Sequence, residues 1–368
     1  MPATVAETAG ALPPRANPEL IGHAAAERAL ADAYASGRLA HAWLIAGPRG
    51  IGKATLAFRF ARWLLAGGAA GEGPGLFGAP APSSDLAVPA EDPVFRLVAS
   101  GGHPDLLTVE RSVDEKSERL RTEITVADVR AVGGFLRLTP AMGGWRIVVV
   151  DGADEMNRNA ANALLKLLEE PPGRSLLLLV CHAPGQLLPT IRSRCRRLDL
   201  PPLGEEDLAR LLAARCPALD AEDRALLVRL AEGSIGRALD LAAEGGAELQ
   251  RIIGGMLAAL PRSDTAALHA LGDRMGRSGG EALFRTATVL LQGWLARLIR
   301  LGAAAPLPEV APGEAAAMRR LLAAGSLDQW LSLWEKTQRL VAQTDAVNLD
   351  RKHVWLTLLL DIEAVARG

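Results

Sequence analysis

The chain has 368 residues, of which 49% are hydrophobic and 23% are charged, and its formal net charge is −1. This composition is typical of a globular protein of two or three domains and excludes a disordered chain. The near-zero charge argues against a protein that grips nucleic acid alone, because such proteins carry an excess of basic residues. We find no apolar run long enough to span a membrane and no secretory signal, so we expect a cytoplasmic protein without membrane contact.

The first half of the chain alternates short apolar strands with helices. Residues 1–17, rich in Ala and Pro, are expected to form a flexible N-terminus. The alternation predicts an α/β domain with a parallel sheet over 18–200. A Gly- and Pro-rich stretch, 66–102, is interpreted as an insertion into this domain. The expected strands are 41–46, 106–110, 146–151 and 175–181, and the expected helices are 18–36, 54–65, 125–136 and 159–170.

The second half of the chain shows only helical patterns. Three short helices, at 205–214, 221–231 and 236–244, predict a small helical lid domain over 201–248. Residues 249–368 are expected to form a third, all-helical domain with a break near 303–313. In this domain Trp330 and Trp334 are four residues apart, and so are Leu327 and Leu331. Such spacing predicts one apolar helix face, which we interpret as core packing.

A glycine-rich motif, Gly47-Pro48-Arg49-Gly50-Ile51-Gly52-Lys53, joins the first strand to the next helix. This context is the one that a Walker A loop requires. The glycines Gly47, Gly50 and Gly52 let backbone N–H groups point at phosphate oxygens, and Lys53 would neutralise the β and γ phosphates. The alternative is a glycine-rich turn that binds nothing.

Two groups that hydrolysis needs are missing from this site. Ala54 stands where a Ser or Thr hydroxyl holds Mg²⁺, and Thr55 lies about 100° further around the helix, so it cannot simply substitute. Asp151 ends the strand 146–151 as in a Walker B motif, but Gly152 replaces the glutamate that activates water. We therefore expect an inactive nucleotide site with no metal requirement, which binds ATP or ADP weakly, in a metal-poor way, or not at all.

Several motifs occur together in order. Residues 157–172 end in Leu-Leu-Glu-Glu-Pro-Pro, and Ser193-Arg194-Cys195 follows; Gly22-His23, His41-Ala42-Trp43 and His103-Pro104-Asp105 lie upstream. Over about 20–200 the chain thereby resembles the clamp-loader subunits of bacterial DNA polymerase III, a family of AAA+ P-loop proteins. The combination is highly specific, although each motif alone is moderately so.

Within that family, the missing groups at Ala54 and Gly152 favour the delta-prime type. A tau- or gamma-type subunit would be a working ATPase, and such chains carry extra domains after the third. The family's lid carries a sensor arginine, but here Arg237 stands one place late. The alternatives that stay open are an active ATPase of tau/gamma type and an unrelated P-loop enzyme such as a nucleotide kinase, although the latter would not explain the ordered motifs.

The resemblance assigns the chemistry to Arg194. In the family this arginine acts as a finger on the ATP of a neighbouring subunit, and the third domain forms a collar that joins five subunits. The implied partners are the tau/gamma and delta subunits, with the sliding clamp and primer–template DNA reached through the complex. The alternative for Arg194 is an ordinary surface arginine beside Arg192, Arg196 and Arg197.

The remaining candidate groups are expected to be chemically silent. The three cysteines, Cys181, Cys195 and Cys216, suit neither a disulfide framework nor a zinc site. Family members often carry a zinc module before the His-Pro-Asp segment, but 66–102 contains no Cys, so we expect no zinc. We interpret Glu169 and Glu170 as a solvated helix end rather than a carboxylate pair for acid–base catalysis.

Overall fold

The computed structural model describes residues 12–68, 85–114, 120–142, 144–262, 264–305 and 308–368. The chain divides into two compact units: Met1–Leu211 with Glu232–Arg237, and Leu212–Ala231 with Ala238–Gly368. Within the described ranges, none of the helices is both long enough and apolar enough to cross a membrane.

The first unit is built on a parallel sheet of five strands in the order β2-β3-β4-β1-β5. The predicted α/β class is therefore confirmed. Every residue of the central strand β4 is buried, as expected for a parallel strand covered on both faces. The sequence analysis missed β5, an edge strand. The strands are β1 (Ala42–Ala46), β2 (Leu106–Val109), β3 (Arg146–Asp151), β4 (Ser175–Cys181) and β5 (Arg196–Asp199).

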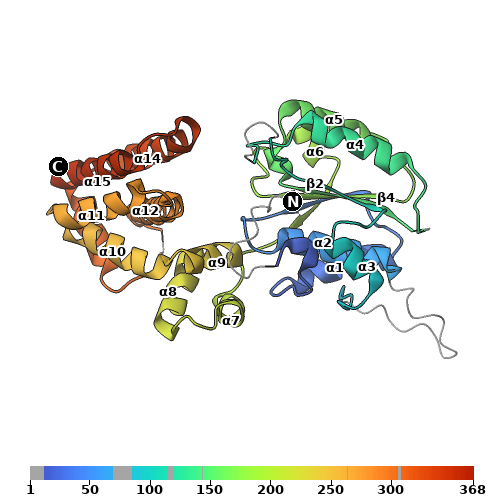
Figure 1. Cartoon of the computed structure of the whole chain (residues 1–368), viewed down its shortest axis with the longest axis horizontal. Helices are drawn as coiled ribbons and strands as arrows, with labels where there is room; N and C mark the ends of the chain where they lie inside the picture. Colours follow the sequence, from blue (N-terminus) through green and yellow to red (C-terminus); the bar gives the residue numbers. More distant parts are fainter. Residues whose placement is uncertain (1–11, 69–84, 115–119, 143, 263, 306–307) are drawn as a thin grey trace. The chain divides into compact units, whose positions relative to one another are not determined.

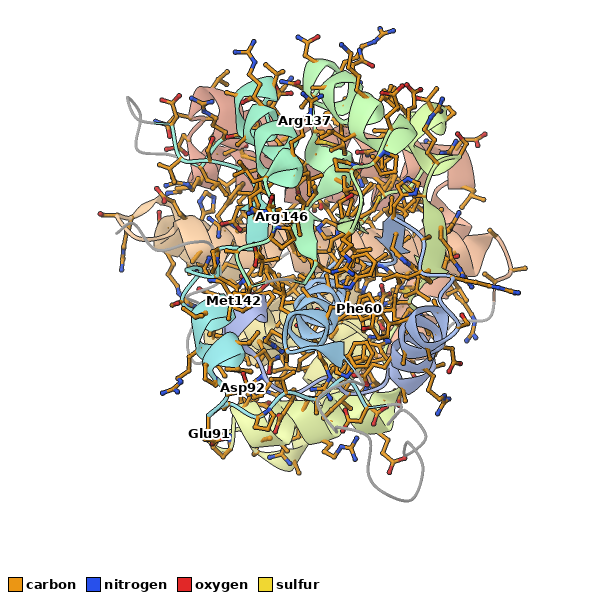
Figure 2. All side chains as sticks on the ribbon, turned by 90° about the vertical axis from the view of Figure 1, so that its right-hand side faces the viewer. Phe60, Glu91, Asp92, Arg137, Met142 and Arg146 are labelled. Atoms are coloured by element: carbon orange, nitrogen blue, oxygen red, sulfur yellow. The ribbon has the colours of Figure 1, made fainter. Side chains whose placement is uncertain are left out.

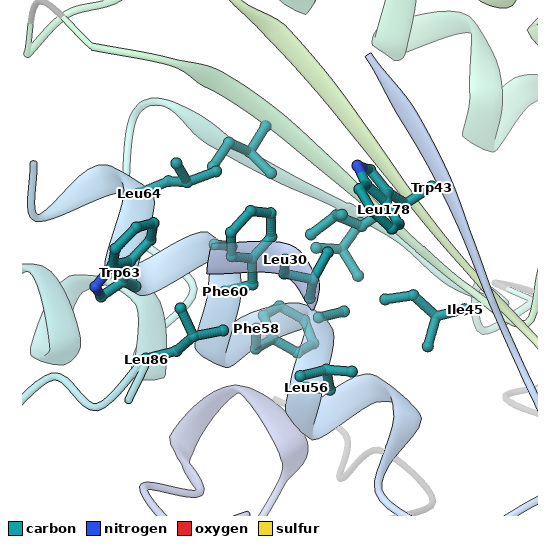
Figure 3. Close-up of a cluster of buried hydrophobic side chains, with 14 of the residues drawn as sticks. Leu30, Trp43, Ile45, Leu56, Phe58, Phe60, Trp63, Leu64, Leu86 and Leu178 are labelled. Atoms are coloured by element: carbon teal, nitrogen blue, oxygen red, sulfur yellow. The ribbon is translucent and has the colours of Figure 1, made fainter. Parts of the chain in front are cut away.

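Helices cover both faces of this sheet (Figure 1). One face carries α1 (Ala24–Ala35), α2 (Lys53–Leu65) and α3 (Pro93–Ala99), and the other carries α4 (Val126–Arg137), α5 (Arg158–Glu169) and α6 (Pro189–Arg192). Because strand side chains alternate between faces, the strands feed two separate cores. Figure 3 shows the core on the α2 side, where Phe58, Phe60 and Trp63 of α2 share one cluster with Trp43 and Leu178 of the sheet.

Local signals explain where several of these helices begin. A capping box is present at the start of α4, where the backbone N–H of Thr125 donates to the Asp128 carboxylate at 2.8 Å. Asn157 caps α5 by accepting from the Ala160 N–H. Helix α3, within the segment interpreted as an insertion, begins at Pro93 because Asp92 caps it and proline suits the first helical turn.

All described residues after β5 are helical or irregular, so the predicted helical region is confirmed. The predicted break is present, since α12 ends at Gly302 and α13 begins at Glu314. The helices are α7 (Glu205–Arg215), α8 (Ala221–Ala231), α9 (Ile235–Ala243), α10 (Gly246–Ala259), α11 (Thr265–Gly276), α12 (Glu281–Gly302), α13 (Glu314–Ala324), α14 (Leu327–Val347) and α15 (Arg351–Arg367).

Helix α14 corrects one part of the sequence analysis. Trp330 is fully buried, as expected, but Leu327 and Leu331 are 37% and 41% exposed. The core-facing stripe of α14 instead includes Trp330, Leu333 and Thr337, which follow one another at intervals of three and four residues. The interpretation of the leucine pair as core packing is therefore wrong, because those positions lie outside this stripe.

Arg62 on α2 holds the segment that precedes α1. The buried Arg62 donates to the carbonyls of Arg15 and Asn17, each at 2.8 Å, and its guanidinium lies 4.6 Å from the Phe95 ring centroid. Burial, together with the nearby positive charge of Arg59, lowers the pKa of Arg62 to about 10. Residues 14–17, which the sequence analysis placed in a flexible N-terminus, thus contain the short helix η1 (Pro14–Ala16) and are tied to α2.

We expect Arg62→Met to destabilise the first unit by about 2–3 kcal/mol, because two half-buried carbonyls lose a charged donor. Amide exchange in 14–17 should accelerate at the same time. Denaturant unfolding and hydrogen–deuterium exchange would measure both effects. The matched control is Arg28→Met, since Arg28 is an exposed arginine on the neighbouring helix α1. Equal effects of the two substitutions would contradict the proposed anchoring.

Candidate functional site

The phosphate loop lies between β1 and α2, as the sequence predicted. Gly50 has a φ of +76°, and a Cβ there would lie 2.4 Å from the Ser234 hydroxyl oxygen. A Cβ at Gly47 would lie 2.4 Å from the Leu200 carbonyl oxygen. Both positions therefore require glycine for packing, whether or not the loop holds a phosphate. Gly52 begins α2 in a left-handed conformation.

The Lys53 side chain points back toward the phosphate loop that precedes it. The side chain is 2% exposed, and its ammonium donates to the Pro48 carbonyl. Burial lowers the pKa of Lys53 to about 8, although the carboxylates of Asp151 and Asp154 act in the opposite direction. The loop lysine thus already has partners within the protein.

The position after Lys53 offers no metal ligand. Ala54 packs against the core on the α2 side, and Thr55 is buried. A methyl group at 54 cannot coordinate Mg²⁺, which prefers oxygen ligands. The side chains present here therefore do not fit the magnesium ion of a working P-loop site.

Gly152 occupies the place of the missing catalytic glutamate and cannot readily accommodate one. Its φ is +85°, and a Cβ would lie 2.8 Å from a carboxylate oxygen of Glu155. Glu155 itself is paired at both oxygens, one with Arg49 and the other with Arg111 at 2.9 Å. Both oxygens of Glu155 are thus occupied by guanidinium groups, so this carboxylate is not free to orient an attacking water.

Two other acidic groups lie near the end of β3: Asp154, which accepts hydrogen bonds within the protein, and Asp151, which is buried. Asp154 accepts the backbone N–H groups of His182 and Ala183 at 2.8 and 2.9 Å. Burial raises the pKa of Asp151 to about 6, and the nearby Glu110 adds to this rise.

Burial, followed by the influence of Asp154, raises the pKa of the Cys181 thiol to about 12. A protonated thiol is a weak hydrogen-bonding group, so Cys181 is a poor sensor of phosphate or water.

Residues 232–237 contact the phosphate loop directly. The Ser234 hydroxyl donates to the Arg49 carbonyl at 2.8 Å, and the Gly236 N–H donates to the Gly50 carbonyl at 2.9 Å. Arg237, which stands one place later than the sensor arginine of the resembling family, forms an ion pair with Glu232 at 3.6 Å. These contacts fasten the loop to residues 232–237 of the same unit.

Arg194 and the phosphate loop lie at opposite ends of the strands, which we call the amino-terminal and the carboxyl-terminal edge of the sheet. The loop follows the carboxyl end of β1, whereas Arg194 precedes the amino end of β5, which runs parallel to β1. The five residues of β1 separate the two edges by roughly 15 Å. Gly47, Gly50, Gly52, Lys53, Ala54, Thr55 and Asp151 are thus gathered at one edge, and Arg194 at the other.

The Arg194 guanidinium is held by two groups. One terminal nitrogen donates to the Thr190 carbonyl at 3.0 Å, and the other forms an ion pair with Glu169 at 2.7 Å. The Arg194 side chain remains 35% exposed. The sequence analysis interpreted Glu169 only as a solvated helix end, so its contact with Arg194 was missed. No local pattern signals a pairing across 25 positions of the chain.

The His-Pro-Asp motif has a structural role. The Asp105 carboxylate is 1% exposed and accepts the N–H groups of Ala141 and Met142 at 2.8 and 2.9 Å. Arg146, labelled with Met142 in Figure 2, lies 3.4 Å from this carboxylate and stacks on the ring of Phe135. The motif therefore fastens the loop between α4 and β3.

The comparisons with known proteins agree with these motifs. Residues 80–204 match a family model described as DNA polymerase III, delta subunit. The delta' subunit of Pseudomonas aeruginosa is 40% identical over 53% of this chain and 53% of its own length, and that of Escherichia coli is 32% identical over 58% and 57%. The tau subunit of Escherichia coli is 31% identical over 62% of this chain and 32% of its own length.

A solved structure of a gamma subunit-related protein from Thermotoga maritima aligns with 89% of this chain and 95% of its own, at 19% identity and a TM-score of 0.43. The chain spans about half the length of the delta' relatives that it matches. The resemblance inferred from the sequence motifs is confirmed: over about half of its length, this chain is similar to delta' subunits of DNA polymerase III.

Proposed function

We propose that the chain is a delta'-type subunit of a DNA polymerase III clamp loader, which takes part in loading the sliding clamp on primed DNA. In this role it assembles with tau/gamma and delta subunits, does not hydrolyse ATP itself, and donates Arg194 to the ATP site of a neighbour. The sliding clamp and primer–template DNA are reached through the complex.

The observation that carries this proposal is the contrast between the two edges of the sheet. At one edge the loop lysine, Asp154 and Glu155 already have partners in the protein, residue 54 lacks the hydroxyl that would hold Mg²⁺, and residue 152 lacks the carboxylate that would activate water. At the other edge a partly exposed arginine is fixed in position, far from its own loop. An arginine finger needs such a placement, because it acts on an anion that another subunit holds.

The nucleotide loop of this chain then has a structural rather than a catalytic role. Backbone N–H groups at the start of α2 retain the general features that favour phosphate. The site is therefore expected to admit ATP or ADP weakly at most, with no requirement for a nucleotide, magnesium or zinc. This expectation has two reasons: Ala54 offers only a methyl group and Gly152 no side chain at all, and residues 66–102 contain no Cys.

The isolated chain should show no steady ATP hydrolysis above background. The physical reason is the absence of both the metal-binding hydroxyl and an unpaired catalytic carboxylate. A coupled phosphate-release assay with and without Mg²⁺ checks this, and a Lys53→Ala variant controls for a contaminating ATPase. Metal-dependent turnover of about 1 s⁻¹ or faster that is lost in Lys53→Ala would favour an active tau/gamma-type ATPase instead.

Assembly is tested separately. The full chain is mixed with purified tau/gamma and delta subunits and analysed by size-exclusion chromatography with light scattering. A stable complex that contains all three kinds of subunit supports the proposal. Failure to enter such a complex at micromolar concentrations would overturn it.

A further inference from the structure

Three motifs that are far apart in the sequence meet at the amino-terminal edge of the sheet. The His41 ring hydrogen-bonds to the Leu168 carbonyl at 3.0 Å, so the start of β1 is fastened to the end of α5. The next residue along α5, Glu169, forms the ion pair with Arg194. On the adjacent strand β5, the guanidinium of Arg196 lies 4.8 Å from the Trp43 ring centroid. The motifs thus form one connected cluster.

This cluster fixes the position of Glu169. Helix α5 ends there because Pro171 and Pro172 cannot continue it. The hydrogen bond from His41 to the Leu168 carbonyl holds the last turn of α5 against the sheet. Glu169 is therefore presented from an anchored helix end, even though its side chain is half-exposed.

We propose that Glu169 is a positioning residue, which holds the guanidinium of Arg194 in the orientation needed to reach the phosphate of a neighbouring subunit. This inference rests on the proposed function and adds a named residue to it. It concerns the protein's own side chains and requires no nucleotide in this chain.

Two contacts from different directions restrict the Arg194 side chain. Thr190 lies on α6, four residues before Arg194, and Glu169 lies on α5, so the planar cation bridges two helices. An unrestrained arginine samples many rotamers, and only a small fraction of them would aim at one point in an adjacent subunit. If the orientation is preformed, the entropy of restricting the side chain is not lost when the complex assembles.

The same pair could instead be read as a lock that withholds the arginine. Its exposure argues against this, because the two side chains are 35% and 49% exposed and such pairs are easily exchanged for a stronger anion. These two contacts also use one donor on each terminal nitrogen, which leaves further donors for phosphate. A lock would make loss of Glu169 activating, whereas a positioning role makes it inhibitory.

The test uses the full chain assembled with tau/gamma and delta subunits, sliding clamp and primed DNA. We define the Arg194-dependent turnover as the difference in DNA-stimulated ATP hydrolysis between the wild type and Arg194→Ala. Glu169→Ala should lower this difference roughly fivefold, with unchanged KM for ATP and unchanged complex formation. Glu169→Gln, whose amide oxygen still accepts a hydrogen bond, should retain more than half of it.

A double variant separates positioning from a merely structural effect. In the Arg194→Ala background, Glu169→Ala should cause no further loss, because the group that it positions is absent. The matched control is Glu170→Ala, since Glu170 is the adjacent exposed carboxylate and has no contact with Arg194 in the described structure.

The outcomes distinguish this inference from the proposed function. Unchanged or increased turnover in Glu169→Ala, or an equal loss in the Arg194→Ala background, would overturn the positioning role while the arginine-finger proposal stands. If Arg194→Ala itself has no effect, the arginine-finger role fails, and the inference fails with it.

Discussion

Replacing Arg194 by alanine is expected to slow ATP hydrolysis at the site that it faces in an assembled clamp loader by on the order of 10³-fold. The guanidinium would supply a fixed planar cation where negative charge develops on the transferred phosphoryl group. Total turnover of the assembly should fall at least by the share of that one site, and further if the sites fire in sequence. DNA-stimulated phosphate release by the reconstituted complex measures the effect.

The control for this experiment is Arg192→Ala. Arg192 is the last residue of α6, two positions before Arg194; it is exposed and carries the same charge, so its loss reproduces the change in net charge but not the loss of the finger. Arg194→Lys should rescue little, because an ammonium does not reproduce the planar fork of donors. If Arg192→Ala and Arg194→Ala slow hydrolysis equally, the assignment of the finger to Arg194 is wrong.

The chain carrying Arg194→Ala should remain folded. The ion pair with Glu169 is partly solvated, so its removal should change the free energy of unfolding by less than about 1 kcal/mol. Unfolding of the isolated variant in urea checks this. A loss of activity in the complex can then be attributed to the missing cation rather than to a damaged subunit.

Four strands and the helices α1, α2, α4, α5 and α7 to α9 could be predicted one by one because their signals are local. Continuous apolar runs such as that of β4 mark strands buried on both faces, and Pro171 marks the end of α5 within the sequence itself. Strand β5 was missed because only Leu198 among its four residues is apolar, as expected for an edge strand with exposed side chains. Its pairing with β1 is a product of the sheet topology rather than of its own pattern.

Some features of the candidate site could also be predicted from local sequence signals, and others could not. The missing groups at Ala54 and Gly152 are visible in the sequence because Walker motifs have fixed spacing. The reason why Gly152 resists replacement is not visible there, since it depends on a backbone φ of +85° and on the folded position of Glu155. The pairing of Glu169 with Arg194 likewise depends on how α5 and α6 lie at one edge of the sheet.

The second unit contains an ion pair whose loss should strongly destabilise it. Arg297 on α12 pairs with Glu314, the first residue of α13, and their side chains are 5% and 7% exposed. The second oxygen of Glu314 accepts the Val310 N–H at 3.2 Å, and the Val310 carbonyl accepts from Arg229 on α8. The pair therefore joins the helices on either side of the break between α12 and α13.

We expect Arg297→Met to destabilise the second unit by about 3–5 kcal/mol, because it leaves the Glu314 carboxylate buried without its cation. The double variant Arg297→Met with Glu314→Leu should recover most of this loss, since no uncompensated charge remains. Hydrogen–deuterium exchange of the α12 and α13 amides measures the change within this unit. The control is Lys336→Ala, which removes the exposed partner of Asp361 and should cost less than about 1 kcal/mol. An equal, small effect of Arg297→Met and Lys336→Ala would show that the buried pair does not hold α12 and α13 together.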